Sequence, residues 1–444
     1  MTSFINRLIF FTVISFFISS CSSSGEAIVQ DDPDEVPVQN GDIPNILFVI
    51  ADDMGLDATP GYNIGTQKPL MPNLQNLINT GVRFNNAWSN PTCSPTRASI
   101  LTGKYGIRNG VVKVDDPLHT SEVALQDYIK TNANNAYSSA VIGKWHLSKN
   151  ANHPNNMGID YYAGPIGGGL QSYSNWSLTI NGQTETSTDY ATTKITDLAI
   201  DWVKDQTKPW FLWLAYNAPH TPFHLPPNNL HNQGALPTDQ GSIDANPLPY
   251  YLAMIEAMDS EYGRFLSSMS QAEKDNTIII FIGDNGTPNQ VLQGYSRGKG
   301  TLYQGGINVP MIIAGKGVTR FNQTEDALIN LTDLFATIAD IAGASISTIN
   351  DSNSFKSLLT QNTNTNNRDY TFIEDGNDDG SVDFSIRNTT HKYMLFENGS
   401  EALFNLTNDP LEATNLMSAS QLPLSASDST IKDELSSKLT EIRN

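Results

Sequence analysis

The chain has 444 residues, and its 26 lysines and arginines stand against 46 aspartates and glutamates, which gives a formal net charge of -20. This length can hold one large α/β domain and a smaller second domain. The negative charge excludes a general binder of nucleic acid or of an anionic membrane surface, because such a protein needs a positive field.

The N-terminal residues predict export and attachment rather than a folded domain. Arg7 precedes an apolar run from 8 to 18, which is too short to span a membrane and is typical of a secretory signal. Cys21 directly follows two serines, as at a bacterial lipoprotein cleavage site. We therefore interpret residues 1–21 as a signal peptide that leaves Cys21 lipidated; ordinary cleavage nearby is the alternative. Residues 22–42 are polar and predict a flexible tether. We expect the protein in the periplasm, or on the outer membrane or cell surface of a bacterium, with membrane contact only through that lipid.

Continuous apolar runs predict strands that are covered on both faces. They lie at 44–50, 140–143, 210–216, 277–282 and 309–314, with a shorter strand at 82–88. Segments with helical spacing of apolar residues alternate with them, at 72–80, 192–204, 252–269 and 330–342. This alternation predicts an α/β domain over residues 43–344.

The rest of the chain predicts an insertion and a second domain. Residues 150–189 are rich in Gly and Asn, with aromatic side chains from Tyr161 to Trp176. We interpret them as a long functional insertion of the kind that lines a binding cleft. A polar linker at 345–367 leads to a small α+β domain at 368–444. Its predicted elements are strands at 370–374, 382–387 and 393–396 and a helix at 430–442.

Polar and charged side chains follow several of the predicted strands. These are Asp52 and Asp53 after the first strand, Lys144 and His146 after the strand at 140–143, His220 after the strand at 210–216, and Asp284 and Asn285 after the strand at 277–282. Because open α/β sheets bind ligands at the carboxyl ends of their strands, we expect these side chains to meet. The structural alternatives are a solvated turn for the aspartates, a hydrogen-bonded structural role for each histidine and a surface position for the lysine.

Cys93 is the only cysteine that remains once Cys21 is set aside, so it cannot close an internal disulfide. The residues from Arg97 to Gly103 have helical character, which places Cys93 at or just before a helix N-terminus. That position favours negative charge on a nucleophile or on a bound anion. A buried structural cysteine is the alternative.

The run from Cys93 to Arg97, with its C-x-P-x-R spacing, is similar to the maturation signal of the type I sulfatases. The stretches that match this family in its own order are Asp52-Asp53, Cys93-Ser94-Pro95-Thr96-Arg97, Gly143-Lys144-Trp145-His146-Leu147, Asn217-Ala218-Pro219-His220, and Gly283-Asp284-Asn285-Gly286 with Lys299 behind it. The residues at 402–410, with Glu412 and Asn415-Leu416, resemble the family's closing segment, so the resemblance spans nearly the whole mature chain.

The resemblance implies the alkaline-phosphatase-like sandwich, with a large central mixed sheet and a smaller C-terminal α+β domain. It also implies an enzyme that hydrolyses sulfate esters. The chain departs from the family at Gln304 and Asn308, where a Glu and an Arg are usual. At these two positions we expect a difference in local rigidity or in substrate preference.

The same resemblance implies a formylglycine and a metal ion. Cys93 would be oxidised to formylglycine by a formylglycine-generating enzyme, and the hydrate of this aldehyde would be the nucleophile. The implied ligands of a divalent cation are Asp52, Asp53, Asp284, Asn285 and the oxidised Cys93. This oxygen-rich set suits Ca²⁺, with Mg²⁺ as the alternative.

The remaining site residues would handle sulfate and protons. The implied contacts to the sulfuryl oxygens come from Arg97, Lys144 and Lys299. Asp284 would accept the nucleophile's proton. His220, together with Lys299, would protonate the departing sugar oxygen, and His146 would deprotonate the second hydroxyl to expel sulfate.

An exported sulfatase would act on sulfated polysaccharides or their oligosaccharides, for example algal glycans such as ulvan or carrageenan. The aromatic side chains from Tyr161 to Trp176 are compatible with sugar stacking in such an enzyme. One alternative is a phosphodiesterase or phosphonate monoester hydrolase of the same superfamily. The other is a glycan-binding lipoprotein without catalysis, whose Cys93 is never converted.

Overall fold

The computed structural model describes residues 43–344, 346, 349–361 and 368–444. The predicted signal peptide at 1–21, with Cys21, and the predicted tether at 22–42 lie outside the described residues. Among the helices of the described part of the chain, none combines the length and apolar character that a membrane crossing requires.

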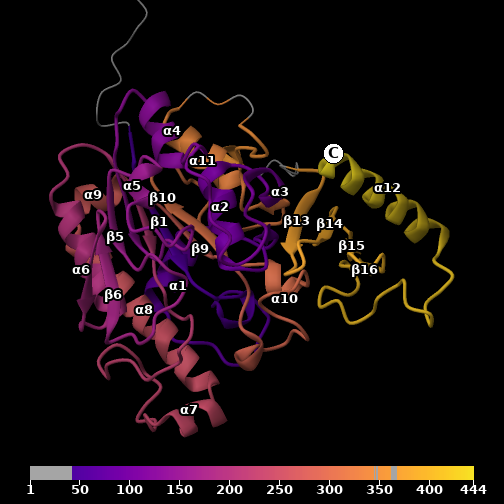
Figure 1. The fold of residues 1–444 in the computed structure, drawn as a ribbon, viewed down its shortest axis with the longest axis horizontal. Helices are drawn as coiled ribbons and strands as arrows, with labels where there is room; N and C mark the ends of the chain where they lie inside the picture. Colours follow the sequence, from indigo (N-terminus) through magenta and orange to yellow (C-terminus); the bar gives the residue numbers. More distant parts are fainter. Residues whose placement is uncertain (1–42, 345, 347–348, 362–367) are drawn as a thin grey trace, which may run out of the picture. The chain divides into compact units, whose positions relative to one another are not determined.

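A mixed sheet of ten strands carries the main domain (Figure 1). In order across the sheet the strands are β11 (Gln323–Glu325), β2 (Gly81–Phe84), β10 (Met311–Gly315), β9 (Thr277–Gly283), β1 (Asn45–Ala51), β8 (Trp210–Ala215), β4 (Ser138–Gly143), β5 (Tyr161–Gly164), β6 (Trp176–Ile180) and β7 (Gln183–Ser187). The strands from β9 to β5 in this order are parallel, whereas β10 is antiparallel to β9 and β6 to β5. The predicted α/β class with a large mixed sheet is confirmed.

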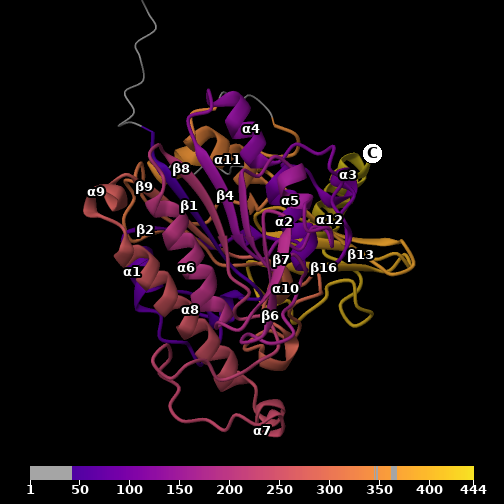
Figure 2. The same ribbon diagram turned by 60° about the vertical axis from the view of Figure 1, so that its left-hand side comes forward.

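Helices cover both faces of the sheet because its central strands are apolar on both sides. Along β1, Ile46 and Phe48 face one core and Leu47 and Val49 the other, and all four are fully buried. The helices of the first face are α2 (Cys93–Thr102), α4 (Leu125–Asn132) and α11 (Asp333–Ile341), and those of the second are α1 (Pro72–Asn79), α6 (Ala191–Lys204) and α8 (Leu248–Ser268). Figure 2 shows the second group side by side over the sheet.

The shorter helices and 3₁₀ turns lie in the connections. They are α3 (Gly106–Asn109), α5 (His153–Asn156), α7 (Gln240–Ala245), α9 (Gln271–Asp275), α10 (Gln304–Ile307), η1 (Leu56–Ala58), η2 (Asn289–Val291) and η3 (Lys356–Leu359). Because the central strands are parallel, their carboxyl ends open at one edge of the sheet, and the residues that follow them gather there.

The predicted strand at 82–88 is in fact two strands in two sheets. β2 ends at Phe84, and β3 (Ala87–Trp88) pairs with β12 (Ile329–Asn330) outside the main sheet. Asn85 and Asn86 make the break, since their side-chain amides donate hydrogen bonds to Asp326 at 2.7 and 2.8 Å. The predicted helix at 330–342 starts later than expected, because Asn330 belongs to β12 and the helix α11 begins at Asp333. The apolar pattern of residues 82–88 cannot reveal hydrogen bonds to a residue far away in the sequence, so the break between the two strands was not predicted.

Residues 150–189 line the pocket beside the histidines only through 167–169, and the expectation that their aromatic rings are free to stack on sugars is wrong. These residues contain α5 and the strands β5 to β7, which extend the main sheet. Tyr162, Tyr173 and Trp176 are 0, 3 and 3% exposed and belong to the core. Short strands between Gly and Asn turns look like a loop in sequence, because each is too brief to show a period.

The C-terminal residues form a second, antiparallel sheet. Its strands, in order, are β13 (Thr371–Gly376), β14 (Val382–Arg387), β15 (His391–Leu395) and β16 (Glu401–Asn405). One face packs on Trp88 and Ile307 of the main domain, and the other on Leu435 and Leu439 of α12 (Ala426–Arg443). The predicted smaller α+β domain is confirmed, and β16 is a strand that the sequence pattern does not predict.

Phe355, which falls in the predicted linker, offers a test of the packing. Its ring is fully buried and meets Phe84 edge-on, with 5.4 Å between the ring centroids. We expect Phe355→Ala to lower the free energy of unfolding in urea by about 3–5 kcal/mol, the usual cost of deleting a buried phenylalanine ring. Phe321 is 62% exposed, so Phe321→Ala should change it by less than about 0.5 kcal/mol. Equal effects of the two substitutions would contradict the burial of this segment.

Candidate active site

Neighbouring strands deliver three carboxylates to one point at the edge of the sheet. Asp52 and Asp53 follow β1, and Asp284 follows the adjacent strand β9. Asp53 has a left-handed backbone with φ of 69°, which turns the chain at this point. Its backbone N–H donates to Oδ1 of Asp284 at 3.1 Å. This bond fixes the two strand ends together.

Each of these carboxylates is paired with a cation from another part of the chain. The pairs are Asp52 with Lys144 at 2.6 Å, Asp284 with Arg97 at 2.7 Å and Asp53 with Lys299 at 2.6 Å. Lys144 is fully buried, and although burial alone would lower its pKa, the Asp52 carboxylate raises it, so the ammonium stays charged. Removing one partner of such a buried pair would leave an uncompensated charge. The three ion pairs therefore hold the ends of β1 and β9 and the cationic side chains in fixed positions.

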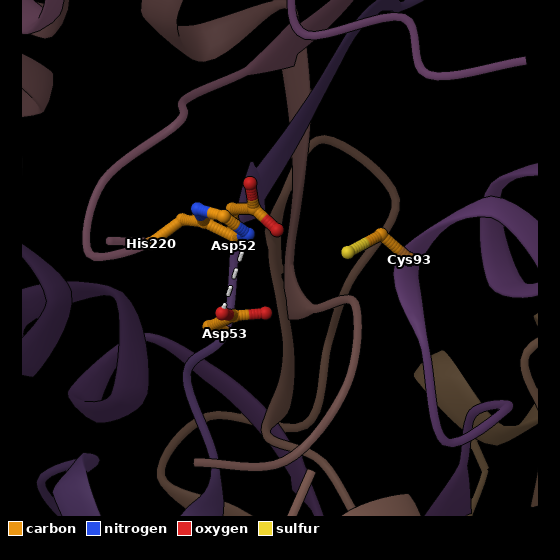
Figure 3. A group of neighbouring side chains, drawn as sticks. All are labelled: Asp52, Asp53, Cys93 and His220. Carbon is orange, nitrogen blue, oxygen red and sulfur yellow. Dashed lines mark ion pairs between the residues drawn. The ribbon is translucent and has the colours of Figure 1, made fainter. Parts of the chain in front are cut away.

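Cys93 is the first residue of α2 and is 1% exposed. Burial raises the pKa of its thiol to about 12, with Lys144 and Lys299 opposing the rise and Asp52 and Asp284 adding to it. Figure 3 shows the sulfur on the side of the helix that faces Asp52 and Asp53. The predicted nucleophile thus lies among the predicted charged residues.

His220 comes to the same place from the loop after β8. Its Nε2 lies 3.7 Å from Oδ2 of Asp53 (Figure 3). Its Nδ1 lies 2.8 Å from the carbonyl oxygen of Thr221. Because a carbonyl oxygen can only accept, Nδ1 carries the hydrogen in the neutral ring. Nε2 is then the nitrogen that exchanges protons with the site.

His146 is held by a residue that the sequence analysis missed, Asp115. Nε2 of His146 lies 2.7 Å from Oδ1 of Asp115, and Nδ1 is buried without a hydrogen-bond partner. Burial, followed by Lys144, lowers the pKa of His146 to about 3, against the raising effect of the Asp115 bond. The backbone N–H of Asp115 also donates to Oγ of Ser94, beside Cys93. No spacing in the sequence links positions 115 and 146.

The buried oxygens of the site fit a divalent cation. Oδ1 of Asp52 and Oδ1 of Asn285 are buried and have no hydrogen-bond partner. Asp52, Asp53, Cys93 and His220 each offer one donor atom, and these atoms all lie within 4.8 Å of one another. Asn285 also donates its amide hydrogen to Asp53 at 2.8 Å. Unpaired carboxylate and amide oxygens are the ligands that a hard cation prefers.

An open pocket of about 590 Å³ gives access to both histidines. His146 and His220 lie on its wall, together with Asp115 and Lys149. Gly168 must be a glycine here, because a Cβ at this position would lie 2.2 Å from the His146 ring. The backbone of this loop therefore comes close to the proton-carrying side chains.

Comparison with known proteins identifies the family. The model of the sulfatase family matches residues 44–344, and the model named "N-sulphoglucosamine sulphohydrolase, C-terminal" matches residues 296–444. The chain therefore belongs to the sulfatase family, in the alkaline-phosphatase-like superfamily.

Individual relatives agree with this assignment. "Uncharacterized sulfatase YdeN" of Escherichia coli is 29% identical over 68% of this chain and 63% of its own length. Rat "Arylsulfatase G" is 28% identical over 68% of this chain and 66% of its own length. The chain thus spans less than two thirds of either relative. The solved structure "Crystal structure of Ps i-CgsB in complex with k-i-k-neocarrahexaose" has the same fold, with a TM-score of 0.76 and 24% identity over 90% of this chain and 93% of that one.

The cation site can be tested without measuring activity. We expect Ca²⁺, added to chelator-treated protein, to raise the melting temperature, because a ligand at one hundred times its Kd stabilises the folded state by about 2.7 kcal/mol. Asn285→Ala should remove most of this shift. Asn285 is preferred for the test because it has no ion-pair partner, so its loss leaves no buried charge alone.

The control is Asn132→Ala, at the exposed end of α4, which should shift with Ca²⁺ as the unchanged protein does. A Ca²⁺ shift of the same size in Asn285→Ala would contradict the site.

Proposed function

We propose that the protein hydrolyses sulfate esters, with Cys93 acting after its oxidation to formylglycine. The observation that carries the proposal is the position of the Cys93 sulfur, which lies within 4.8 Å of a donor atom of each of Asp52, Asp53 and His220. Membership in the sulfatase family supports this assignment. The formylglycine hydrate would supply the hydroxyl that attacks sulfur.

The three cations would hold the sulfuryl oxygens. Arg97 and Lys144 are fixed by their carboxylate partners before any substrate arrives, so they need little reorganisation during the reaction. A bound Ca²⁺, with Mg²⁺ as the alternative, would be held by Asp52, Asp53, Asp284 and Asn285 and would lower the pKa of the attacking hydroxyl. The site would then meet a sulfate group with fixed positive charge.

The two histidines would divide the proton transfers. Nε2 of His220 faces the site; as an imidazolium, with hydrogens on both nitrogens, the ring would give its Nε2 proton to the departing alcohol, assisted by Lys299. Nδ1 of His146 has no partner and would accept the proton whose loss expels sulfate. Its low pKa leaves the imidazole neutral at neutral pH, as a base requires.

We extend the proposal to sulfated glycans as the substrate class. The pocket beside the histidines, of about 590 Å³, has room for a sugar residue next to the reacting group. The structural relative described above was solved in complex with a neocarrahexaose, which supports a glycan as the class of substrate. Algal polysaccharides such as ulvan and carrageenan are the finer hypothesis within this class.

Conversion of Cys93 by a formylglycine-generating enzyme is part of the proposal. The side chain is 1% exposed in the folded chain, so the enzyme would have to reach it before folding is complete. Conversion before folding fits a protein that is exported. We therefore propose that the protein is exported as a periplasmic or surface lipoprotein.

The main test measures both the modification and the activity. We expect mass spectrometry of the peptide that contains Cys93 to show the aldehyde, and the protein to hydrolyse 4-nitrophenyl sulfate faster than bis(4-nitrophenyl) phosphate. Cys93→Ala should lower kcat/KM by at least about a thousandfold, because it removes the nucleophile. Faster hydrolysis of the phosphate diester would favour the phosphodiesterase alternative. An unmodified thiol in inactive protein from the native host would favour the non-catalytic one.

Asp115 can be tested as the residue that positions His146. Asp115→Ala removes the acceptor for the Nε2 hydrogen, so we expect one rapid release of nitrophenol per active site, followed by turnover about a hundredfold slower than in the unchanged enzyme. Asp115→Asn keeps an acceptor and should lie between the two. Asp160→Asn, at an exposed ion pair with Lys130, is the control and should turn over normally. Steady turnover of Asp115→Ala at the control rate would show that His146 does not need Asp115.

A further inference from the structure

A second pocket, of about 300 Å³, lies apart from the catalytic one and shares no lining residue with it. The residues of this second pocket that matter here are Tyr62, Arg83, Tyr295, Gln304, Asn308 and Arg387. Arg83 lies on β2 and Arg387 on β14 of the C-terminal sheet, Gln304 and Asn308 lie in and directly after α10, and the two tyrosines lie in the loops that follow η1 and η2. No aspartate or glutamate lines the pocket among the described residues.

Both arginines of the second pocket lack a carboxylate partner in the described part of the chain. Arg83 stacks on the ring of Tyr62 at 5.2 Å, and its buried Nε has no hydrogen-bond partner. Arg387 is 4% exposed and donates only to uncharged oxygens, among them Oδ1 of Asn86 at 3.0 Å. In a chain with a net charge of -20, two such guanidinium groups in one pocket are a local excess of positive charge.

The nearby carboxylate of Glu412 is already engaged. It accepts from Nζ of Lys392 at 2.6 Å and from the backbone N–H of Gln304 at 2.6 Å. Burial lowers the pKa of Arg387 to about 10, and Glu412 only partly offsets this. A buried guanidinium of this kind is stabilised when an anion comes within hydrogen-bond distance.

Two side-chain amides add neutral polar groups to the same pocket. Gln304 and Asn308 are 3 and 8% exposed, and their carbonyl oxygens have no hydrogen-bond partner. The amide nitrogen of Asn308 donates to the backbone oxygen of Asn85 at 3.1 Å, so its Oδ1 remains as an acceptor. The pocket therefore offers guanidinium groups to an anion and amide oxygens to hydroxyl donors.

We propose that the second pocket binds a small oxyanion, of the kind carried by an acidic sugar as a carboxylate or a sulfate group. The volume of about 300 Å³ admits a monosaccharide, and the free amide oxygens fit sugar hydroxyls. Inorganic sulfate is the other source of the same oxyanion. The proposal stands on the arginines and amides alone and does not depend on sulfatase activity.

The test is isothermal titration of the full chain with sodium glucuronate, sodium sulfate and glucose. We expect glucuronate to bind and the uncharged glucose to give no signal. Arg83→Gln should weaken glucuronate binding at least about tenfold, because a charge-assisted hydrogen bond is lost. Gln304→Glu should abolish binding, since it places a carboxylate in the pocket that both guanidinium groups line. If Arg83→Gln does not fold, Arg83→Lys, which keeps the charge but not the planar fork, should still bind more weakly.

Arg443→Gln makes the same change in net charge outside the pocket, where Arg443 stacks on Phe384 at 4.2 Å, and should bind as the unchanged protein does. Stronger binding of glucuronate than of sulfate would assign the pocket to an acidic sugar, and equal binding would assign it to a free oxyanion; both support the site. Absence of binding at millimolar concentrations, or binding that is unchanged in both Arg83→Gln and Gln304→Glu, would overturn the proposal.

Discussion

The buried ion pair between Arg97 and Asp284 joins the parts of the structure on which the site depends. Arg97 belongs to α2 and Asp284 to the end of β9, and both side chains are at most 1% exposed. The same guanidinium donates to the backbone oxygen of Lys144 at 2.8 Å, at the end of β4. One side chain therefore holds a helix against two strand ends, and Cys93 lies one helical turn before it. Without this ion pair, α2 would lose the contact that fixes its orientation, and one charge would be buried without a partner.

Charge balance explains how a strongly acidic chain can hold a site for an anion. The carboxylates at the sheet edge are each matched by a lysine or an arginine, so the edge is close to neutral while the rest of the molecule is not. A divalent cation bound to the same carboxylates would make it positive. The lysine and arginine groups, still fixed by their partners, would then present a larger net positive charge to an anionic substrate.

The sequence predicted the parts of the site that come directly after a buried strand. β1, β8 and β9 are apolar on both faces, so their ends and the residues that follow were readable from the pattern. The start of α2 at Cys93 was readable for the same local reason. The role of Asp115 could not be predicted, because its contact with His146 joins two loops that have no periodic pattern. The extension of the sheet by β5 to β7 could not be predicted either, because the register of short strands is set by neighbours distant in sequence.

The pocket beside the histidines is walled by loop residues around Asp115, Lys149 and Gly168. The loop with Lys149 also carries Lys144, which pairs with Asp52, and the loop with Asp115 holds His146, whereas the residues around Gly168 form none of the ion pairs of the site. Exposed residues of this wall, such as Lys149, can therefore change during evolution without disturbing the paired carboxylates. Under the proposed function, a lineage with this scaffold could exchange one sugar for another by altering exposed residues of these three loops, and the chemistry would be inherited intact.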